Sequence, residues 1–404
     1  MIHTRRAALR DAHRGGCSTL TRMSWKQGQG TVPVRAALGW WPMSSAAPVH
    51  SARPGLSARP ARCYPGPLMK RTGGHLALIF SLCLGACPGE TPDDEVEWQL
   101  VHRDLPGALL SVWGTGSRDV WAVGGDARDG TGPLVLHFDG EAWTRVPTGE
   151  AQGDLWWVFG FADGPIYMGG AGGVILRYEG GAFTRMTTPG ADTVFGIWGA
   201  TPAEVWAVGG ASDSSGGFAW RLTGDAWAPE PTLPAEISSS AAIWKVFGTG
   251  PDDAWLVGSK GVALRWDGSE LTPGATGVGS SLFTVHAHDG RYAAVGGSAS
   301  GIIVEHDGAQ WNNVTPDPLP MGFAGVTLGA DDFGVAVGSF GSVYTRSAAG
   351  WAPEELGFTV GVNLHGSWID ERGGVWAVGG QTFSPPYNEG VLIHRGAVIS
   401  GEGL

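Results

Sequence analysis

Residues 111–125 read SVWGTGSRDVWAVGG, and residues 196–210 read GIWGATPAEVWAVGG. Each stretch holds a short apolar run, a polar turn and a second apolar run that ends in paired glycines. The first glycine of that ending recurs along the chain at intervals of 38 to 49 residues, at Gly124, Gly169, Gly209, Gly258, Gly296, Gly338 and Gly379. A recurrence of this length indicates a repeated supersecondary unit, so the sequence predicts seven copies of one unit.

Each unit contains signals for four short strands. A third apolar run ends in a turn, as in LHFDG at 136–140 and LRWDG at 264–268, and a fourth run carries a large aromatic residue such as Trp143 or Trp227. The Asp-Gly pairs favour tight hairpins. Because a small sheet cannot bury both faces alone, neighbouring units must cover it, and the recurring tryptophans are predicted to form that core. We therefore predict an all-β fold, a seven-bladed β-propeller of four-stranded antiparallel blades over residues 97–404.

Closure of the ring requires a strand from one end of the chain. The seventh unit lacks a tryptophan in its own fourth strand, and Glu97–Val101 resembles a lone fourth strand. We expect this N-terminal strand, with Trp98, to complete the seventh blade and remove an open sheet edge. The segment Ala397–Ile399 is the alternative.

Charge and cysteine content restrict the function. From Cys87 onward, 14 Lys and Arg stand against 37 Asp and Glu, a net charge of −23. Such an acidic body repels nucleic acid, so no nucleic-acid partner is expected. No cysteine follows Cys87. The predicted propeller therefore has no disulfide, thiol nucleophile or cysteine metal site.

A secretion signal precedes the repeats. Residues 69–86 begin with Met-Lys-Arg and continue with an apolar run, and LGAC at 84–87 resembles the lipobox of bacterial lipoproteins. The resemblance implies cleavage before Cys87 and acylation of its thiol and amine. An ordinary secretion signal with an incidental cysteine is the alternative. We expect 69–86 to be a lipoprotein signal peptide and 87–96 a lipid-anchored acidic linker.

The basic residues 1–68 precede that signal. They are interpreted as upstream sequence before a start at Met69, with a disordered basic leader as the alternative. The anchor at Cys87 predicts attachment to a membrane of the cell envelope, the outer membrane because no acidic residue follows Cys87 directly. A monomer is expected.

The repeats resemble two propeller families. Gly124-Gly125, Phe138-Asp139 and Trp143 resemble the kelch repeat of galactose-oxidase-type propellers. The stretches LRWDGSE and LHFDGEAW resemble Asp-box and photosystem assembly factor-like propellers, although the step from Asp139 to Trp143 is one residue shorter than an Asp-box has. The resemblance implies the fold and carries no activity. Kelch-like oxidases use copper with a cysteine-modified tyrosine, which this propeller cannot form, and no cofactor is expected.

Other chemistry-bearing residues give weak signals. Arg177, Arg221 and Arg265 would suit a sialidase, but each occupies the same place in its unit, where His137 and Glu305 also stand, so a solvated or rim position is predicted. The pair His286 and His288, with Asp289, is half of a metal site at most, and a packed or partly exposed histidine is the preferred interpretation. The loops 125–133 and 211–217 lack the alternating acids of a calcium loop. We predict no catalytic residue and no metal site.

One set of residues forms a candidate ligand site. Three positions before the first-strand aromatic, each unit contributes one residue, a set we call the axial ring: Leu110, Trp156, Phe195, Trp244, Phe283, Ala324 and His365. First strands surround the axis of a propeller, so these residues would encircle it near one mouth. They either pack the channel or form an aromatic platform for a sugar, a peptide or a small apolar ligand. The binding candidates are Trp156, Phe195, Trp244, Phe283 and His365.

The function predicted from these features is a non-catalytic binding module that holds an envelope protein or glycan partner. The alternatives are an envelope hydrolase acting on glycans and an assembly factor for an envelope complex. A hydrolase would need carboxylates from several blades, such as Asp252, Asp253, Asp331 and Asp332, to converge in one cleft. Their place in polar turns favours a structural role.

Overall fold

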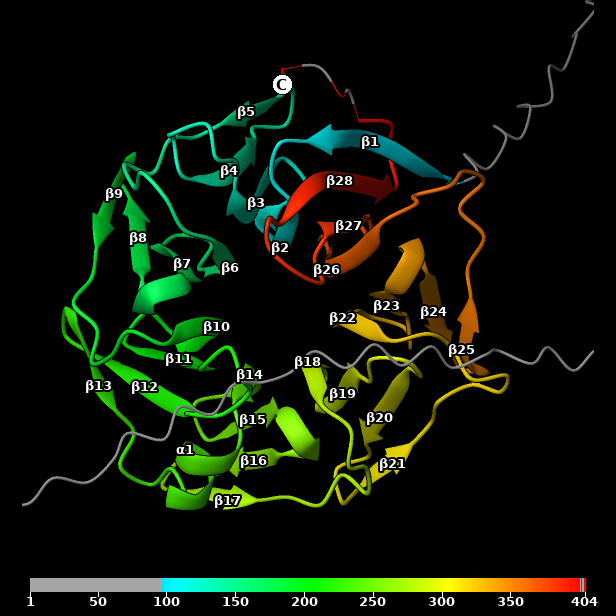
Figure 1. The fold of residues 1–404 in the computed structure, drawn as a ribbon. Coiled ribbons are helices and arrows are strands. Elements are labelled where there is room, and N and C mark those ends of the chain that lie inside the picture. Colours follow the sequence, from blue (N-terminus) through cyan, green and yellow to red (C-terminus); the bar gives the residue numbers. More distant parts are fainter. Residues whose placement is uncertain (1–95, 400, 402) are drawn as a thin grey trace, which may run out of the picture. The chain divides into compact units, whose positions relative to one another are not determined.

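Seven antiparallel sheets of four strands surround one axis in the computed structural model, which describes residues 96–399, 401, 403 and 404. Figure 1 looks along this axis, with the first strand of every blade innermost. The fold is the predicted seven-bladed β-propeller. The predictions for 1–68, 69–86, Cys87 and the linker up to residue 95 concern positions outside the described residues.

The strands of each blade are given from the axis outward. Blades one to four consist of β2 (Leu109–Gly116), β3 (Asp119–Asp126), β4 (Pro133–Phe138) and β5 (Trp143–Arg145); β6 (Leu155–Gly160), β7 (Ile166–Gly170), β8 (Ile175–Glu179) and β9 (Ala182–Arg185); β10 (Thr193–Thr201), β11 (Glu204–Gly210), β12 (Phe218–Thr223) and β13 (Ala226–Pro229); and β14 (Ile243–Gly250), β15 (Asp253–Gly258), β16 (Ala263–Trp266) and β17 (Leu271–Pro273).

Blades five to seven follow the same plan. They consist of β18 (Leu282–His288), β19 (Arg291–Gly296), β20 (Ile302–His306) and β21 (Trp311–Asn313); β22 (Phe323–Leu328), β23 (Gly334–Gly338), β24 (Val343–Ser347) and β25 (Gly350–Pro353); and β26 (Asn363–Ile369), β27 (Val375–Gln381), β28 (Asn388–Arg395) and β1 (Trp98–Leu105).

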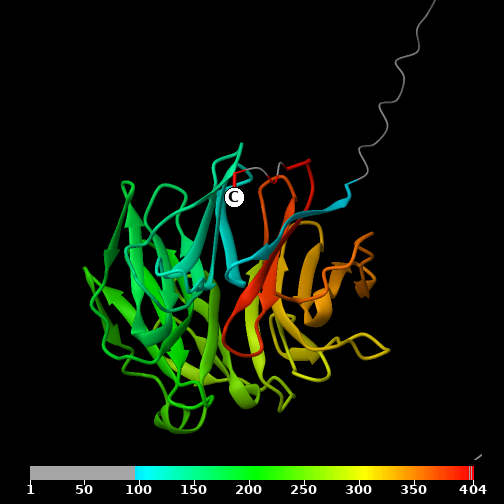
Figure 2. The same cartoon turned by 45° about the horizontal axis from the view of Figure 1, so that its top comes forward.

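The N-terminal strand closes the ring. β1 pairs with β28, with Trp98 opposite Arg395 and Leu105 opposite Gly390, and Figure 2 shows the two strands side by side. The Trp98 ring is 7% exposed and packs against blades six and seven. The alternative segment Ala397–Ile399 forms no strand, and the Gln99 side-chain amide donates a hydrogen bond to the Ala397 carbonyl at 3.0 Å.

The hydrophobic core lies between the blades, as the recurring tryptophans predicted. Trp121 of blade one packs against blade two, and Trp206 of blade three packs against blade four. Trp376 of blade seven, with no exposed surface, packs against blade one. Each ring covers a sheet face that its own blade leaves open, so the blades stabilise one another.

Helices are few and short in the described part of the chain. One α-helix, α1 (Ala235–Ser240), precedes β14, and three single turns of 3₁₀-helix follow second strands, η1 (Ala171–Gly173), η2 (Ser259–Gly261) and η3 (Ser339–Gly341). None of the helices in these residues has the length and apolarity needed to cross a membrane.

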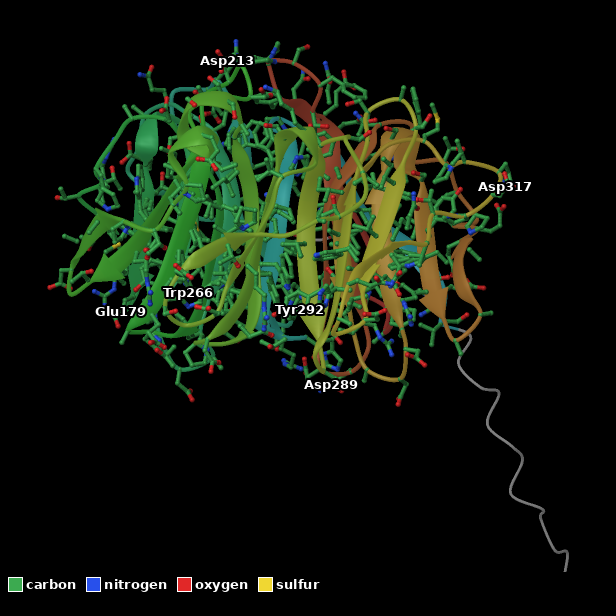
Figure 3. The ribbon with its side chains drawn as sticks, turned by 90° about the horizontal axis from the view of Figure 1, so that it is seen from below. Glu179, Asp213, Trp266, Asp289, Tyr292 and Asp317 are labelled. Carbon is green, nitrogen blue, oxygen red and sulfur yellow. The ribbon has the colours of Figure 1, made fainter. Side chains whose placement is uncertain are left out.

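The ring has two unlike faces. Asp213, in the loop between β11 and β12, lies on the face we call the loop face, and Asp289, in the turn between β18 and β19, lies on the opposite, turn face (Figure 3). The loop face also carries the connections into each first strand. Trp98 pairs with Arg395, which pairs with Val375 at the start of β27. Second strands such as β27 begin at the turn face. The chain therefore enters the propeller at the turn face.

Candidate functional site

Every innermost strand carries a β-bulge at the same point. The pairing of β2 with β3 moves from Leu109 directly to Ser111, which leaves Leu110 without a cross-strand partner. The other six innermost strands skip the corresponding residue, at Trp156, Phe195, Trp244, Phe283, Ala324 and His365. A bulge turns one side chain out of the alternation of the strand. All seven bulged residues are the members of the axial ring.

Six members of the axial ring line a single cavity of about 490 Å³ on the loop face. Leu110 is the exception: it has no exposed surface and does not belong to the lining. Residues of the loop between β27 and β28 complete the lining, with Phe383, Pro385 and Tyr387. A cavity of this volume, lined by aromatic rings and a few polar groups, has the size and chemistry of a ligand pocket.

The aromatic residues of the cavity form one continuous arc. Trp156 contacts Tyr387 and Phe195 edge to face, with ring centroids 5.2 Å apart in both pairs. Phe195 contacts Trp244 at 4.7 Å, and Trp244 contacts Phe283 at 6.3 Å. Edge-to-face contacts between neighbouring rings fix their orientation. The arc therefore presents a continuous aromatic wall to the cavity.

Two ionisable side chains also line the cavity. Lys245, in β14, is only 4% exposed, and its Nζ donates to the Phe195 carbonyl at 2.6 Å and lies 4.0 Å from the Trp157 ring centroid. Burial lowers the pKa of Lys245 to about 7. His365 Nδ1 lies 2.6 Å from the Leu110 carbonyl. Desolvation, assisted by the Lys245 charge, lowers the pKa of His365 to about 4.

A carboxylate stands in the cavity wall beside the arc. Asp154 precedes β6 and accepts a hydrogen bond from the Asp126 N–H at 2.8 Å. Burial raises the pKa of Asp154 despite this bond, and the nearby Asp126 charge adds to the effect. The cavity thus combines an apolar wall with one acidic and one basic group at separate points.

Exposed apolar side chains stand on the same face, along blades six and seven. Phe340, in η3, is 64% exposed and Phe383 is 70% exposed. Leu319 and Met321, in the connection into β22, are also exposed. Phe340 has a left-handed backbone with φ 56°, a conformation that costs a residue with a side chain free energy. An exposed, strained phenylalanine is a poor choice for stability alone.

The turn carboxylates do not converge. Asp119 binds Thr115, Trp121 and His137, all in blade one. Asp253 accepts from the Tyr292 hydroxyl at 2.8 Å, and Asp332 pairs with Arg291 and Arg346. Each carboxylate is thus held within its own blade or by a neighbouring one. Asp252 and Asp331, in the same turns, are exposed.

The remaining predicted groups occupy structural positions. His286 accepts a hydrogen bond from the Leu328 N–H at 3.1 Å and lies 4.1 Å from the Phe247 ring, as a packed histidine does. Within residues 96–399 the structure brings together no group of three or more His, Cys, Asp or Glu suited to a metal ion. In the loops considered for calcium, Asp129 binds Thr131 and Arg145, and Asp213 binds Ser215.

Arg221, at the third-strand position predicted to be solvated or on the rim, has a side chain that is 27% exposed. Its guanidinium lies between the rings of Trp206 and Trp266, 4.7 and 4.8 Å from their centroids, at the junction of blades three and four. The position lies directly opposite the second-strand aromatic. A planar cation fits between two aromatic faces, which the sequence pattern of Arg, His and Glu did not reveal.

Sequence reasoning missed three contributors to the cavity. Lys245 follows a ring residue and gave no motif, and Asp154 lies just before a strand. Tyr387 belongs to a loop whose length differs between blades. The repeat pattern identified the ring because it recurs, whereas these groups occur once and carry no periodic signal.

Seven four-stranded sheets around an axial cavity define the chain as a seven-bladed β-propeller module. Comparison with solved structures agrees: the propeller resembles virginiamycin B lyase from Staphylococcus aureus, with 14% identity and a TM-score of 0.55 over 73% of this chain and 99% of that one. It resembles YCF48 bound to D1 peptide, with 14% identity and a TM-score of 0.57 over 76% and 98%. It also resembles the WD40 propeller domain of Doa1, with 15% identity and a TM-score of 0.56 over 74% and 96%.

Identities this low show a shared fold and nothing further. No protein-family model and no curated protein sequence matches the chain.

Proposed function

We propose that this protein is a non-catalytic binding module whose axial cavity receives an apolar group of a protein partner. The observation that carries the proposal is the axial ring: seven blades place seven bulged residues around one point, and six of them line a cavity of about 490 Å³. Blade packing alone does not require such a cavity, because a channel of this kind can be filled by larger side chains.

A protein segment fits the surroundings of the cavity better than a glycan does. The exposed side chains of Phe340, Phe383 and Met321 extend the apolar surface beyond the opening. Interfaces between proteins concentrate aromatic residues and methionine in this way. The solved YCF48 propeller with its bound peptide is a precedent for the fold in that role.

The direction of the chain suits an anchored receptor. The described chain enters at the turn face, opposite the cavity. A lipid anchor at Cys87, followed by the acidic linker, would leave the loop face turned away from the membrane. We propose that the protein is held in this way on the cell envelope, at its outer membrane.

Peptide display tests the binding proposal. Peptides selected from a random library against the purified protein should contain a recurring apolar or aromatic residue. Trp244→Ala and Phe195→Ala should weaken the selected peptides by about tenfold or more, as for aromatic residues at the centre of an interface. The matched control is Phe183→Ala, an aromatic of β9 outside the cavity lining. If the selected peptides bind the two cavity variants with the same affinity as the wild type, the proposal is refuted.

Metabolic labelling tests the anchor. Cells expressing the protein from Met69 are given an alkyne-tagged fatty acid, and the label should appear on the protein and disappear in Cys87→Ser. The variant should also leave the membrane fraction, because several acyl chains provide the anchoring free energy. A membrane-bound Cys87→Ser protein would contradict this anchor while leaving the cavity proposal untouched.

A further inference from the structure

Lys245 is a buried cation without an acidic partner. Its side chain is 4% exposed, and its hydrogen bond goes to the Phe195 carbonyl. Among the described residues no carboxylate forms an ion pair with it, and burial alone accounts for its lowered pKa. Buried charges in proteins are normally paired with an opposite charge, because desolvation is costly.

The innermost strands of the neighbouring blades surround Lys245. Its neighbour around the axis is Gly196, where an added Cβ would lie 3.1 Å from the Lys245 Cα. The absence of a side chain there lets the main chains of β10 and β14 lie close together. The Lys245 ammonium lies over the Trp157 ring, whose Nε1 donates to the Ile197 carbonyl at 2.9 Å. The ammonium is thus held by a glycine, a carbonyl and an indole face, at a wall of the cavity.

No other ionisable side chain among the described lining residues offers a positive charge to an anion, so the Lys245 ammonium is the candidate binding group. With a pKa of about 4, His365 is neutral at pH 7. The Asp154 carboxylate binds the Asp126 N–H and pairs with no lysine. Among the described lining residues Lys245 is therefore the single cationic side chain, and its ammonium donates to the main-chain carbonyl of Phe195, whose side chain lines the same cavity.

We propose that the axial cavity recognises a carboxylate, with the Lys245 ammonium as its counter-ion and the aromatic arc as the seat of the adjoining apolar group. This inference rests on the proposed binding function and adds the chemistry of the ligand. A carboxylate beside an aromatic or aliphatic group occurs at the C-terminus of a protein, in an acidic side chain next to an apolar one, and in small aromatic acids. A charge-assisted hydrogen bond to the carboxylate would use a second of the three ammonium donors, beside the one that the Phe195 carbonyl accepts.

Ligand-observed NMR titration of the full chain tests the proposal with 3-phenylpropanoate and its neutral analogue 3-phenylpropanamide. The acid should bind at least about tenfold more tightly than the amide, the gain expected of a hydrogen bond to a charged group. Lys245→Met should abolish this preference while amide binding persists. The matched control is Lys260→Met, an exposed lysine of η2 in the same blade that is bonded to the Ser240 carbonyl.

The outcomes separate the two proposals. Equal binding of acid and amide, or an acid preference that survives Lys245→Met, would overturn the carboxylate inference and leave the apolar cavity standing. Binding of neither probe would overturn both. Circular dichroism on each variant verifies folding, and Lys245→Met should fold well because methionine fills a similar volume without a charge.

Dependence on pH supplies a second readout. The affinity for 3-phenylpropanoate should fall as the pH rises through about 7, because Lys245 loses its proton there. His365 titrates near pH 4, and burial holds the pKa of Tyr387 above its usual 10.0. Asp154 is removed from the comparison by measuring Asp154→Asn in parallel. If the affinity does not change across this pH range, the assignment to Lys245 is contradicted.

Three short peptides identify the source of the carboxylate. They are acetyl-Gly-Gly-Phe as the free acid, the same peptide as the amide, and acetyl-Phe-Glu as the amide. Tight binding of the free acid alone indicates a protein C-terminus, and tight binding of the third peptide indicates an acidic side chain. Preference for phenylpropanoate over every peptide indicates a small acid. A wild-type protein that prefers the peptide amide would refute the proposal.

Discussion

The side-chain oxygen of Gln99 accepts a hydrogen bond from the main-chain N–H of Ile399 at 3.0 Å, although the two residues lie 300 positions apart. The same amide group donates to Ala397. Both candidate closing segments therefore lie at the seam of the propeller, the place in blade seven where the two ends of the chain meet. The N-terminal segment supplies the strand, and the C-terminal segment is held along it by the Gln99 side chain.

Trp98→Ala should destabilise the propeller more than any other change at the seam. Removing a ring that is 7% exposed between blades six and seven is expected to lower the free energy of unfolding by about 3–5 kcal/mol. Gln99→Ala should cost about 1 kcal/mol, because it removes hydrogen bonds near the surface. Denaturant unfolding measures both, and equal effects would mean that the strand contributes little through its core face.

Arg221→Met should lower the free energy of unfolding by about 1–3 kcal/mol, since it removes a cation from between two indole rings and leaves Glu230 less well paired. Glu230 is 7% exposed, and its carboxylate lies 3.9 Å from the guanidinium. Adding Glu230→Gln should recover part of the loss. A single variant as stable as the wild type would show that methionine packing replaces the cation fully.

Phe340→Gly should leave the propeller as stable or make it more stable, by up to about 1–2 kcal/mol, because it relieves a left-handed backbone. Gly172→Phe, at the equivalent place in η1 with φ 70°, is the reverse experiment. A Cβ at Gly172 meets nothing within 4 Å, so any loss there reports the backbone alone. Destabilisation by Phe340→Gly would assign that ring a packing role.

Stability should fall as the pH is lowered from about 6.5 toward 4. Burial lowers the pKa of His394 to about 4 and of His286 to about 3, so the unfolded chain binds protons that the folded chain excludes. Their stabilising neutral forms are fully present above about pH 6.5 and are lost as the pH falls through this window. His394→Gln should make the dependence of the unfolding free energy on pH shallower by about one proton. An unchanged slope would contradict the shift.

Stability should rise between about pH 7 and 9 through Lys245. Its folded pKa of about 7 lies below the usual 10.5, so in this window the unfolded chain is protonated where the folded chain is neutral. Lys245→Met removes the group and should flatten that part of the pH profile. Thermal unfolding of the two proteins at several pH values measures the difference, and parallel profiles would argue against a buried ammonium.

The sequence predicted the blades because their cause is local. Paired glycines, polar turns and alternating apolar residues determine strands one at a time, and the spacing of Gly124 and Gly169 measures one blade. Closure by Trp98 followed from a missing partner in the seventh unit. The axial ring was also found by counting, although the bulge that turns Trp156 toward the axis was not, because a bulge is a property of strand pairing.

The electrostatics could not be predicted in the same way. Nothing in the sequence distinguishes Lys245 from the other charged residues. Its surroundings come from other blades, with Gly196 in the preceding blade and Trp157 two blades back. The contact of Arg221 with Trp266 likewise exists only where two blades meet. Such contacts join different repeats, often more than one repeat length apart, and no local pattern records them.

The recurring bulge assigns strand pairing and ligand contact to different residues of the same strand. Residues on either side of it, such as Leu155 and Trp157, pair with β7 and hold the blade, while Trp156 between them has no pairing duty. Each blade therefore offers one position that can be exchanged without disturbing the ladder, as Ala324 and His365 already show beside the larger rings. The six such positions that line the cavity form a combinatorial surface, on which new ligand preferences can evolve, or be engineered, one blade at a time.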